Sequence, residues 1–144
     1  MFGGCGGLAV GEDAVLDAAR EARQGAYAPY SGLRVGAALV DRRGHIHTGA
    51  NVENASFGLT MCAERVALGA AVAHGARRFD RLVIVTDRDP PVAPCGACRQ
   101  ALAEFGLDLR IEAVGPQQRR GWRLTELLPD PFGPRDLPDA MDAK

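Results

Sequence analysis

The sequence predicts a single domain of the α/β class. The chain has 144 residues, which is a usual length for one domain. A nearly continuous apolar run at 81–86 is typical of a strand that is covered on both faces. A helical pattern over 95–105 and a second strand pattern over 109–114 follow it, and this order indicates a right-handed crossover between parallel strands. The sequence contains no internal repeat and no linker, so residues 12–137 should fold as one unit.

The composition is that of an ordinary soluble globular protein. Apolar residues make up 47% of the chain and charged residues 24%. The net charge of −1 argues against a large basic surface for nucleic acid. No apolar run approaches the ~20 residues of a membrane span, and the start of the chain lacks the pattern of a signal peptide. Because cysteines in metal-like spacing suit a reducing compartment, we expect a cytoplasmic protein that binds neither nucleic acid nor membranes.

The two ends of the chain differ from its middle. Residues 1–11 are rich in glycine, and both they and 138–144 should be flexible tails. Cys5 could supply a fourth ligand to a structural zinc site, but a flexible tail holds a ligand poorly, so we expect a free thiol. After the first tail, small apolar residues recur at three- and four-residue steps and predict a helix over 12–24, which Gly25 can close.

A β-hairpin should follow this helix. Residues 33–40 and 45–50 have strand patterns, and 41–44 are a plausible four-residue loop between them. His45 and His47 are two residues apart and therefore share one face of the second strand. Such a pair could bind a metal ion, but we expect both side chains on the solvent side of a hairpin near the sheet edge.

The second half of the chain alternates helices with other elements. An alanine-rich helix is predicted over 62–73, with His74 and Gly75 suited to its carboxyl end. A proline-rich loop should occupy 87–93, and a single helical turn is expected at 125–128 before the prolines that follow.

Two short stretches carry the chemistry, and each opens a predicted helix. Cys62 and Glu64 are two residues apart, and Cys95 and Cys98 are three apart. Zinc takes thiolate ligands in tetrahedral geometry, and a catalytic zinc site keeps one position open for water. Three cysteines fill three positions. Glu64 could then move protons for a water that the metal makes acidic.

The motifs around these stretches resemble the cytidine deaminase family, in its small, homotetrameric, three-cysteine zinc branch. The resemblance covers roughly residues 12–137 and rests on motifs that stand in the family's order. The motifs are Ala26-Tyr27-Ala28-Pro29-Tyr30-Ser31, Val35-Gly36-Ala37-Ala38-Leu39, Asn51-Val52-Glu53-Asn54-Ala55, Cys62-Ala63-Glu64-Arg65, Pro94-Cys95-Gly96-Ala97-Cys98-Arg99-Gln100, Leu127-Leu128-Pro129 and Phe132-Gly133-Pro134. The resemblance implies a three-layer α/β/α fold with a mixed sheet of about five strands. It also implies zinc-dependent hydrolysis of cytidine and deoxycytidine to uridine and deoxyuridine plus ammonia, in pyrimidine salvage.

The resemblance assigns roles around the metal. The three cysteines would hold Zn²⁺, and Glu64 would be the catalytic acid and base. Three thiolates make the zinc electron-rich, so donors that draw charge off the sulfurs should help. In the resembling branch the arginine that matches Arg65 bonds to the zinc thiolates, and Arg99 is a second candidate for this task.

The resemblance also assigns substrate contacts. Asn51 and Glu53 would hydrogen-bond the ribose 3′-hydroxyl, because an amide and a carboxylate together complement a group that both donates and accepts. On sequence alone the same residues fit ordinary turn chemistry. Leu33 stands where the family commonly has Phe near the pyrimidine, which gives up stacking worth about 0.5–1.5 kcal/mol. Ala63 would contact the substrate, and Phe132 would either reach a neighbouring subunit's site or pin only its own tail.

Other functions stay open at this point. A deaminase of the antibiotic blasticidin S shares the cysteine motifs, although Asn51, Glu53 and the Phe132-Gly133-Pro134 tail favour cytidine. A structural zinc module would need four protein ligands, and editing of polynucleotides would need a basic stretch interleaved with aromatic residues. Because no arginine or lysine cluster flanks Asn51 and Glu53, we expect the nucleoside rather than its 5′-phosphate to be the substrate.

Overall fold

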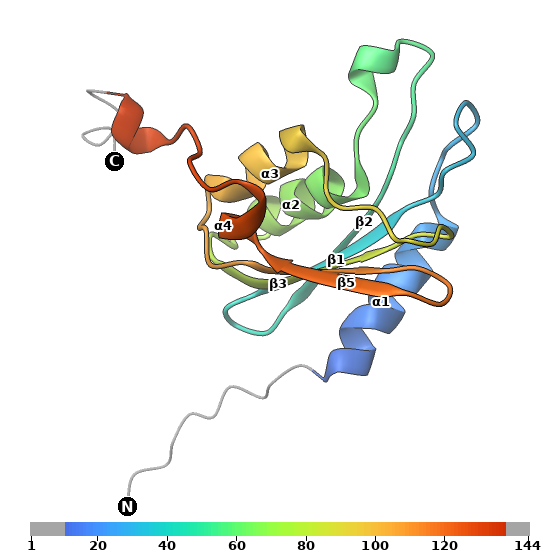
Figure 1. Cartoon of the computed structure of the whole chain (residues 1–144), viewed down its shortest axis with the longest axis horizontal. Helices are drawn as coiled ribbons and strands as arrows, with labels where there is room; N and C mark the ends of the chain where they lie inside the picture. Colours follow the sequence, from blue (N-terminus) through green and yellow to red (C-terminus); the bar gives the residue numbers. More distant parts are fainter. Residues whose placement is uncertain (1–10, 138–144) are drawn as a thin grey trace, which may run out of the picture.

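A mixed five-stranded sheet forms the middle layer of the structure, a computed structural model that describes residues 11–137 (Figure 1). Its strands are β1 (Gly36–Asp41), β2 (Ile46–Ala50), β3 (Phe79–Val85), β4 (Arg110–Val114) and β5 (Arg119–Arg123). Their order across the sheet is β2-β1-β3-β4-β5. Strands β3 and β4 are parallel, and the other neighbouring pairs are antiparallel. The predicted strand–helix–strand crossover therefore joins β3 to β4.

Helices cover both faces of this sheet and complete the predicted three layers. Helix α1 (Glu12–Gln24) lies on one face, while α2 (Ala63–Ala73) and α3 (Gly96–Ala103) lie on the other (Figure 1). The short helix α4 (Leu124–Leu127) follows β5 directly, close to the predicted turn at 125–128. Two 3-10 turns, η1 (Phe57–Leu59) and η2 (Pro134–Asp136), complete the elements.

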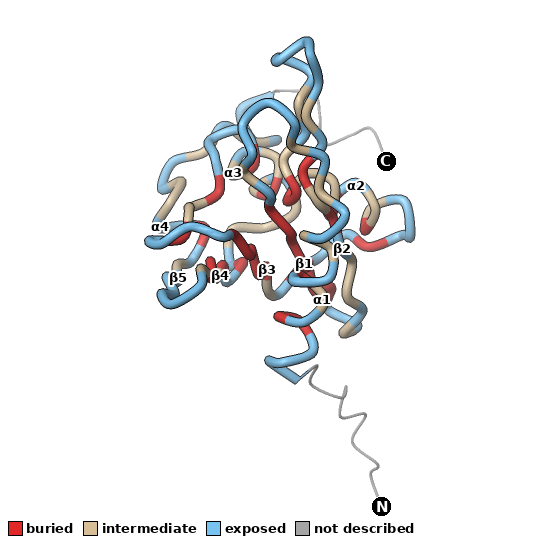
Figure 2. The backbone as a smooth tube through the Cα atoms, turned by 90° about the vertical axis from the view of Figure 1, so that its right-hand side faces the viewer, coloured by how far each residue is buried: buried red, intermediate tan, exposed pale blue. Residues whose placement is uncertain are grey.

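The apolar run of β3 is buried from both sides because its residues alternate between the two helical layers. Val83 and Val85 pack in the cluster that α1 covers, and Leu82 and Ile84 pack in the cluster beneath α2 and α3. Figure 2 shows the buried parts of the chain concentrated along β1 and β3. The continuous hydrophobicity of 81–86 is thus explained by a central position in the sheet.

The first predicted strand begins later than its sequence pattern indicates. Residues 33–35 lie outside β1, which starts at Gly36. In place of strand-to-strand hydrogen bonds, this backbone bonds the side chain of Asn51. The Oδ1 of Asn51 accepts the N–H of Val35 at 2.8 Å, and its Nδ2 donates to the carbonyl of Leu33 at 2.8 Å. The prediction for 33–35 was wrong because a distant side chain competes for this backbone.

The fifth strand, β5, carries no pattern that would predict it. Its side chains are mostly exposed, and three of its five residues are arginines. The guanidinium of Arg120 lies over the ring of Trp122, 4.7 Å from the ring centroid. An edge strand with two polar faces lacks the apolar alternation from which strands are identified.

The β1–β2 hairpin lies at the sheet edge, as predicted, but its two histidines differ. The side chain of His45 is 65% exposed and that of His47 only 9%. Both rings face the buried carboxylate of Asp41, which confirms that they share a face. The predicted solvent position of His47 was wrong, because its hydrogen bond to Asp41 at 3.1 Å draws the ring inward.

The predicted tails fall almost entirely outside the described residues. Residues 1–10 and 138–144, and with them Cys5, are not described, while Gly11 caps α1. Within residues 11–137, no helix combines the length and apolar character that crossing a membrane requires.

Candidate active site

The predicted zinc ligands lie together at the amino ends of two neighbouring helices. Cys62 is the N-cap of α2 and Cys95 is the N-cap of α3, while Cys98 lies in the first turn of α3. The two helices pack against each other on the same face of the sheet. Helix amino ends present free N–H groups and partial positive charge, so they favour thiolates.

The three sulfur atoms fit the geometry of a zinc site. All lie within 4.8 Å of one another, and the Sγ atoms of Cys62 and Cys95 are 3.7 Å apart. Two thiolates on one tetrahedral zinc, each bonded at ~2.3 Å, are separated by roughly 3.8 Å. Within residues 11–137, this is the one group of at least three Cys, His, Asp or Glu side chains with metal-site spacing. The described ligands therefore leave one of four tetrahedral positions open.

Arg65 supports the thiolates from the first turn of α2. Its Nη2 lies 3.9 Å from the sulfur of Cys62 and 3.3 Å from the carbonyl oxygen of Thr60. A hydrogen bond from Cys98 lowers the pKa of Cys62 to about 5, and Arg65 adds to this effect. The same bond raises the pKa of Cys98, which acts as the donor. Arg65 Nε is buried and has no hydrogen-bond partner within the described chain.

Glu64 lies beside this cluster and is 5% exposed. Burial raises the pKa of its carboxyl to about 7, opposed by its own backbone N–H and assisted by the nearby Cys62 sulfur. A carboxyl with such a pKa can both accept and release a proton near neutral pH. Glu64 lines the same cavity as Cys62 and Cys95.

A cavity of about 310 Å³ lies next to these residues, and most of the predicted site residues line it. Its walls include Glu64, Ala63, Leu33, Asn51 and Glu53, together with two of the cysteines. The lining is mostly apolar, with polar groups at a few points, as is usual for small-molecule sites. No Arg, Lys or His side chain appears among its lining residues within 11–137, so its ionisable side chains are carboxylates and thiols.

Asn51 and Glu53 line this cavity, and their side chains also hydrogen-bond the backbone segments that form its walls. Asn51 bonds the backbone around Leu33, as described above, and keeps one Nδ2 hydrogen free. Glu53 Oε1 accepts the N–H groups of Tyr30 and Ser31, and Oε2 accepts the Ser31 hydroxyl at 2.6 Å. The Ser31 hydroxyl is the main cause that lowers the pKa of Glu53. Both side chains therefore retain hydrogen-bonding capacity toward a ligand while fixing the loop around it.

Comparison with known proteins agrees with this geometry. A family model described as the cytidine and deoxycytidylate deaminase zinc-binding region matches residues 11–112. The chain belongs to the cytidine deaminase family. The cytidine deaminase of Halalkalibacterium halodurans is 45% identical over 87% of this chain and 96% of its own length. A probable cytidine deaminase of Dictyostelium discoideum is 46% identical over 85% of this chain and 84% of its own length.

Solved structures of cytidine deaminases share the fold. The enzyme of Burkholderia pseudomallei has a TM-score of 0.81 at 46% identity, covering 85% of this chain and 99% of that one. The enzyme of Mycobacterium tuberculosis has a TM-score of 0.72 at 43% identity, covering 84% and 96%. The matched zinc-binding region includes both cysteine stretches, so this family member is a zinc-dependent hydrolase and Zn²⁺ is its cofactor.

One predicted substrate contact of this deaminase lies away from the cavity of its own chain. Phe132 is 60% exposed and is not among the cavity's lining residues. Its carbonyl oxygen accepts the Nε2 hydrogen of Gln100 at 2.8 Å. Arg99 also bonds backbone rather than sulfur, donating to the carbonyls of Pro94 at 2.8 Å and Leu127 at 3.1 Å. Helix α3 therefore holds the carboxyl-terminal segment as well as two cysteines.

Sequence reasoning missed several residues that shape the deaminase cavity. Ser31, Thr60, Met61, Val92 and Ala93 contribute to the walls. Ser31 closes one of the motifs of the resemblance, but its bond to Glu53 spans 22 residues and no local period indicates it. Val92 and Ala93 lie in the proline-rich loop, whose path depends on tertiary contacts.

Proposed function

We propose that this chain hydrolyses cytidine and deoxycytidine to uridine and deoxyuridine with release of ammonia. The observation that carries the proposal is the buried Glu64 carboxyl beside three converging thiol sulfurs, at the base of a cavity of nucleoside size. We further propose that Cys62, Cys95 and Cys98 are the zinc ligands. The thiol character of all three supports a reducing, cytoplasmic location. Hydrolysis of cytidine to uridine would give the protein a role in pyrimidine salvage.

Glu64 moves the protons of this reaction. Bound zinc supplies a Lewis acid that makes water acidic at neutral pH. Glu64 accepts the proton that the attacking water loses and passes it to N3 of cytosine, which makes C4 more electrophilic. When the C4–N4 bond breaks, the same carboxyl carries the hydrogen of the new C4 hydroxyl to the departing amine, which leaves as ammonia, while C4 becomes a carbonyl and the first proton stays on N3. One water is consumed for each amine released, so atoms and charges balance.

The remaining cavity residues position the nucleoside. Asn51 donates its free Nδ2 hydrogen and Glu53 accepts with its remaining lone pair, so together they match one ribose hydroxyl. Leu33 and Ala63 supply apolar contact with the base. Arg65 keeps charge off the zinc through its contact with the Cys62 sulfur.

The cavity favours a nucleoside over a nucleotide. A 5′-phosphate would meet Glu53 without a nearby cation, and two unit charges 4 Å apart repel by about 1 kcal/mol in water and several-fold more in a drier site. The turnover number divided by KM should therefore be at least about a hundredfold lower for CMP than for cytidine, equal to ~2.7 kcal/mol. Comparable values for the two substrates would contradict the nucleoside assignment.

We also propose a homotetramer. A set of large apolar side chains lies exposed beside the cavity, and patches of this kind mark interaction surfaces. The set is linked by backbone bridges and by an edge-to-face ring contact of 5.7 Å between Tyr30 and Phe57. Its members are Tyr27, Tyr30, Val52, Phe57, Leu59 and Met61.

An ultraviolet assay tests the activity directly. Loss of cytidine absorbance should be accompanied by an equal amount of ammonia. Glu64→Gln provides the control, because it should retain zinc and lose the reaction. Turnover of blasticidin S without turnover of cytidine would overturn the proposed substrate, and a zinc with four protein ligands and no turnover would indicate a structural module instead.

A further inference from the structure

Strand β5 lies at an edge of the sheet, and part of its backbone points outward without a partner. Beside the β4–β5 turn, the N–H of Gly115 donates to the carbonyl of Gln118 at 2.9 Å, and at the other end Leu124 donates to the residue just before β4. Residues that bond across an antiparallel ladder alternate with residues whose N–H and C=O point away. The backbone groups of Arg119 and Gly121 therefore lie at the open edge, where the described part of the chain gives them no partner.

The sheet face next to this edge has no helix of its own. Helix α1 packs over β1, β2 and β3, and Figure 2 shows it on the β1 side of the sheet, away from β4 and β5. Val114 at the end of β4 still packs in the cluster that α1 covers. Side chains alternate along a strand, so Glu112 and Arg110 point to the same face as Val114. They lie on the part of this face that α1 leaves open.

Four arginines and one glutamate occupy this open face. Arg123 is the ladder partner of Arg110 and so shares its face, and Arg119 lies two pairs further along. Glu112 pairs with Arg81 of β3 at 2.9 Å and with Arg119 at 3.1 Å. Within residues 11–137, Arg110 and Arg123 have no carboxylate partner, and Arg123 donates only to a backbone carbonyl. The face is therefore positive, in a chain whose net charge is −1.

We propose that β5 accepts an extended acidic segment of a partner protein, which adds to the sheet as a sixth strand. The outward N–H and carbonyl groups of Arg119 and Gly121 supply the backbone hydrogen bonds, as in other cases of strand addition. Acidic side chains at alternate positions of the added strand lie beside Arg119 and Arg123, where opposite charges attract across neighbouring strands. Gly121, between the two arginines, leaves room for the side chain next to it.

The charges on this edge select the partner. A second copy of β5 brought edge to edge would place arginine beside arginine, and like charges disfavour such a pair. Proteins that bind single-stranded nucleic acid stack bases on exposed aromatic rings in a basic groove. The aromatic ring of β5 is on the other face, because Trp122 packs against the cluster beneath α2 and α3 and the guanidinium of Arg120 lies over it. An acidic peptide fits both the charges and the free backbone.

Binding of a defined peptide to the intact, zinc-loaded protein tests the proposal. The probe is a short fluorescent peptide, capped at both ends, in which Glu and Thr alternate, and anisotropy reports its binding. Wild type should bind it, and rising salt should weaken the binding because the charges on this face are exposed. A peptide with Lys in place of Glu should not bind. A single-stranded oligonucleotide is measured in parallel.

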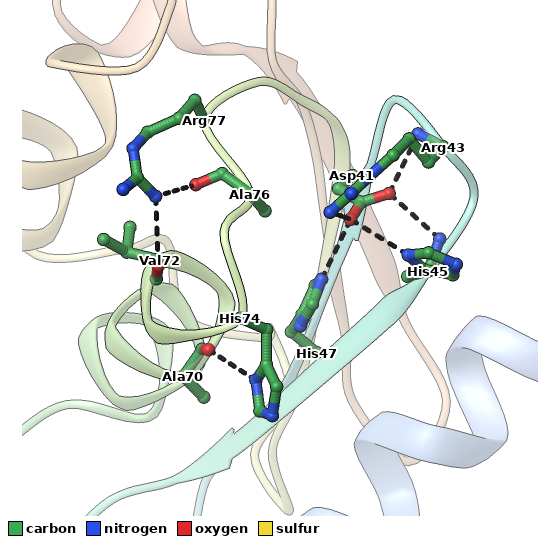
Figure 3. Close-up of polar contacts among 9 residues, drawn as sticks. All are labelled: Asp41, Arg43, His45, His47, Ala70, Val72, His74, Ala76 and Arg77. Carbon is green, nitrogen blue, oxygen red and sulfur yellow. Dashed lines mark hydrogen bonds and ion pairs between the residues drawn. The ribbon is translucent and has the colours of Figure 1, made fainter.

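One pair of variants tests the charges. Arg119→Gln combined with Arg123→Gln should weaken peptide binding by roughly 2- to 30-fold, as expected for the loss of two cross-strand charge pairs. Arg42→Gln combined with Arg43→Gln removes the same charge from the hairpin at the other edge of the sheet, where Arg43 faces Asp41 (Figure 3), and should leave the affinity unchanged. Zinc content and melting temperature show that each variant is folded.

A second pair of variants tests the backbone contacts. Gly121→Pro removes an N–H that points outward and spares the ladder with β4, so it should weaken the peptide by roughly 3- to 10-fold. Gly121→Ala keeps this N–H, and its Cβ would lie 3.7 Å from the carbonyl oxygen of Ile111, an ordinary contact. It should bind as wild type does. If the proline variant does not fold, the arginine variants still decide the question.

Three results would overturn the proposal. They are full-affinity binding to a folded Gly121→Pro, equal binding to wild type and to the variant with both Arg119 and Arg123 replaced, and no binding of the acidic peptide to wild type. Binding of the oligonucleotide alone, lost in that double variant, would make the face a nucleic-acid surface instead. These measurements do not depend on the proposed deaminase substrate, since peptide binding is observed directly.

Discussion

In the proposed mechanism, burial rather than a partner side chain prepares Glu64 for proton transfer, because burial is the main cause that raises the pKa of its carboxyl. Replacing it with Gln keeps the shape and removes the ability to move protons. Turnover of cytidine should fall roughly 10²–10⁴-fold, while zinc per chain stays unchanged. Steady-state rates and metal analysis of the same preparation check this, and a loss below about tenfold would show that another group moves the proton.

Leu33 gives a second prediction at the scale of the residue. Leu33→Phe should restore an aromatic contact with the pyrimidine and lower KM by up to about tenfold, with little change in the turnover number. Steady-state kinetics with cytidine measure both constants. Val35→Ile, also at the cavity wall, is a size control that adds no ring. A loss of activity in Leu33→Phe would mean that the wall has been repacked around leucine.

Asp41 makes stability depend on pH. Burial opposes its ionisation, but hydrogen bonds from His47 and from the backbone N–H groups of His45 and Arg43 outweigh this and lower its pKa from 3.8 to about 2. A lowered carboxyl pKa stabilises the folded state above pH 4, and this contribution disappears as the pH falls from about 4 toward 2. Asp41→Asn should therefore cost about 1–3 kcal/mol at neutral pH and progressively less below pH 4.

Urea unfolding across this pH range measures the effect. Asp80→Asn is the matched control, because Asp80 is 51% exposed and its contact with Arg42 is at 3.5 Å. Its free energy of unfolding should stay within about 0.5 kcal/mol of wild type. A difference between Asp41→Asn and wild type that does not shrink on acidification would contradict the assignment.

The grouping of the three cysteines with Glu64 could be predicted from sequence because their spacing within each stretch is local. Cys62 with Glu64, and Cys95 with Cys98, lie within one helical turn of each other. The backbone contacts of Asn51 with residues 33 and 35, and of Arg99 with Leu127, could not be predicted, because these partners lie 16 to 28 residues away. A side chain that bonds distant backbone leaves no local pattern.

At the scale of the element, the site depends on how closely α2 approaches the sheet. A Cβ added at Gly49 of β2 would lie 2.4 Å from the backbone nitrogen of Ala67 and 2.5 Å from the carbonyl oxygen of Ala63. Backbone atoms cannot rotate away. Gly49→Ala should therefore destabilise the fold by roughly 1–3 kcal/mol or more and lower the zinc affinity, because it displaces the helix that carries Cys62.

Gly69→Ala is the counterpart on the same helix. A Cβ at this position meets nothing within 4 Å, and replacing glycine inside a helix should stabilise it by about 0.5–1 kcal/mol. Thermal unfolding and chelator competition compare the two variants. Equal zinc affinity in both would show that the close contact of β2 and α2 does not position the metal site.

Elements with one apolar face were predictable, and elements without one were not. Helix α1 begins and ends where its three- and four-residue pattern does, because Val15, Leu16 and Ala19 form a single buried stripe. Strand β5 was missed because its basic residues are exposed on both faces. The resemblance to a family implied five strands, but only tertiary structure shows where the fifth one lies.

At the scale of the whole molecule, the exposed side chain of Phe132 is not among the residues that line the cavity of its own chain. We expect it to complete the cavity of a neighbouring subunit. Mixing inactive Glu64→Gln with inactive Phe132→Ala subunits should then restore activity, because some mixed sites receive both intact groups. Verified subunit exchange without any recovery would show that Phe132 serves its own chain, and mixing two batches of Glu64→Gln is the control.

The division of the sulfur cluster between two helices has a consequence for how the protein matures. Cys95 and Cys98 are three residues apart, whereas Cys62 is 33 residues from Cys95 and reaches them only when α2 docks beside α3. Completion of the three-sulfur site and closure of the contact between these helices are therefore a single event. The rate at which a chelator strips the enzyme should consequently report how often these two helices part.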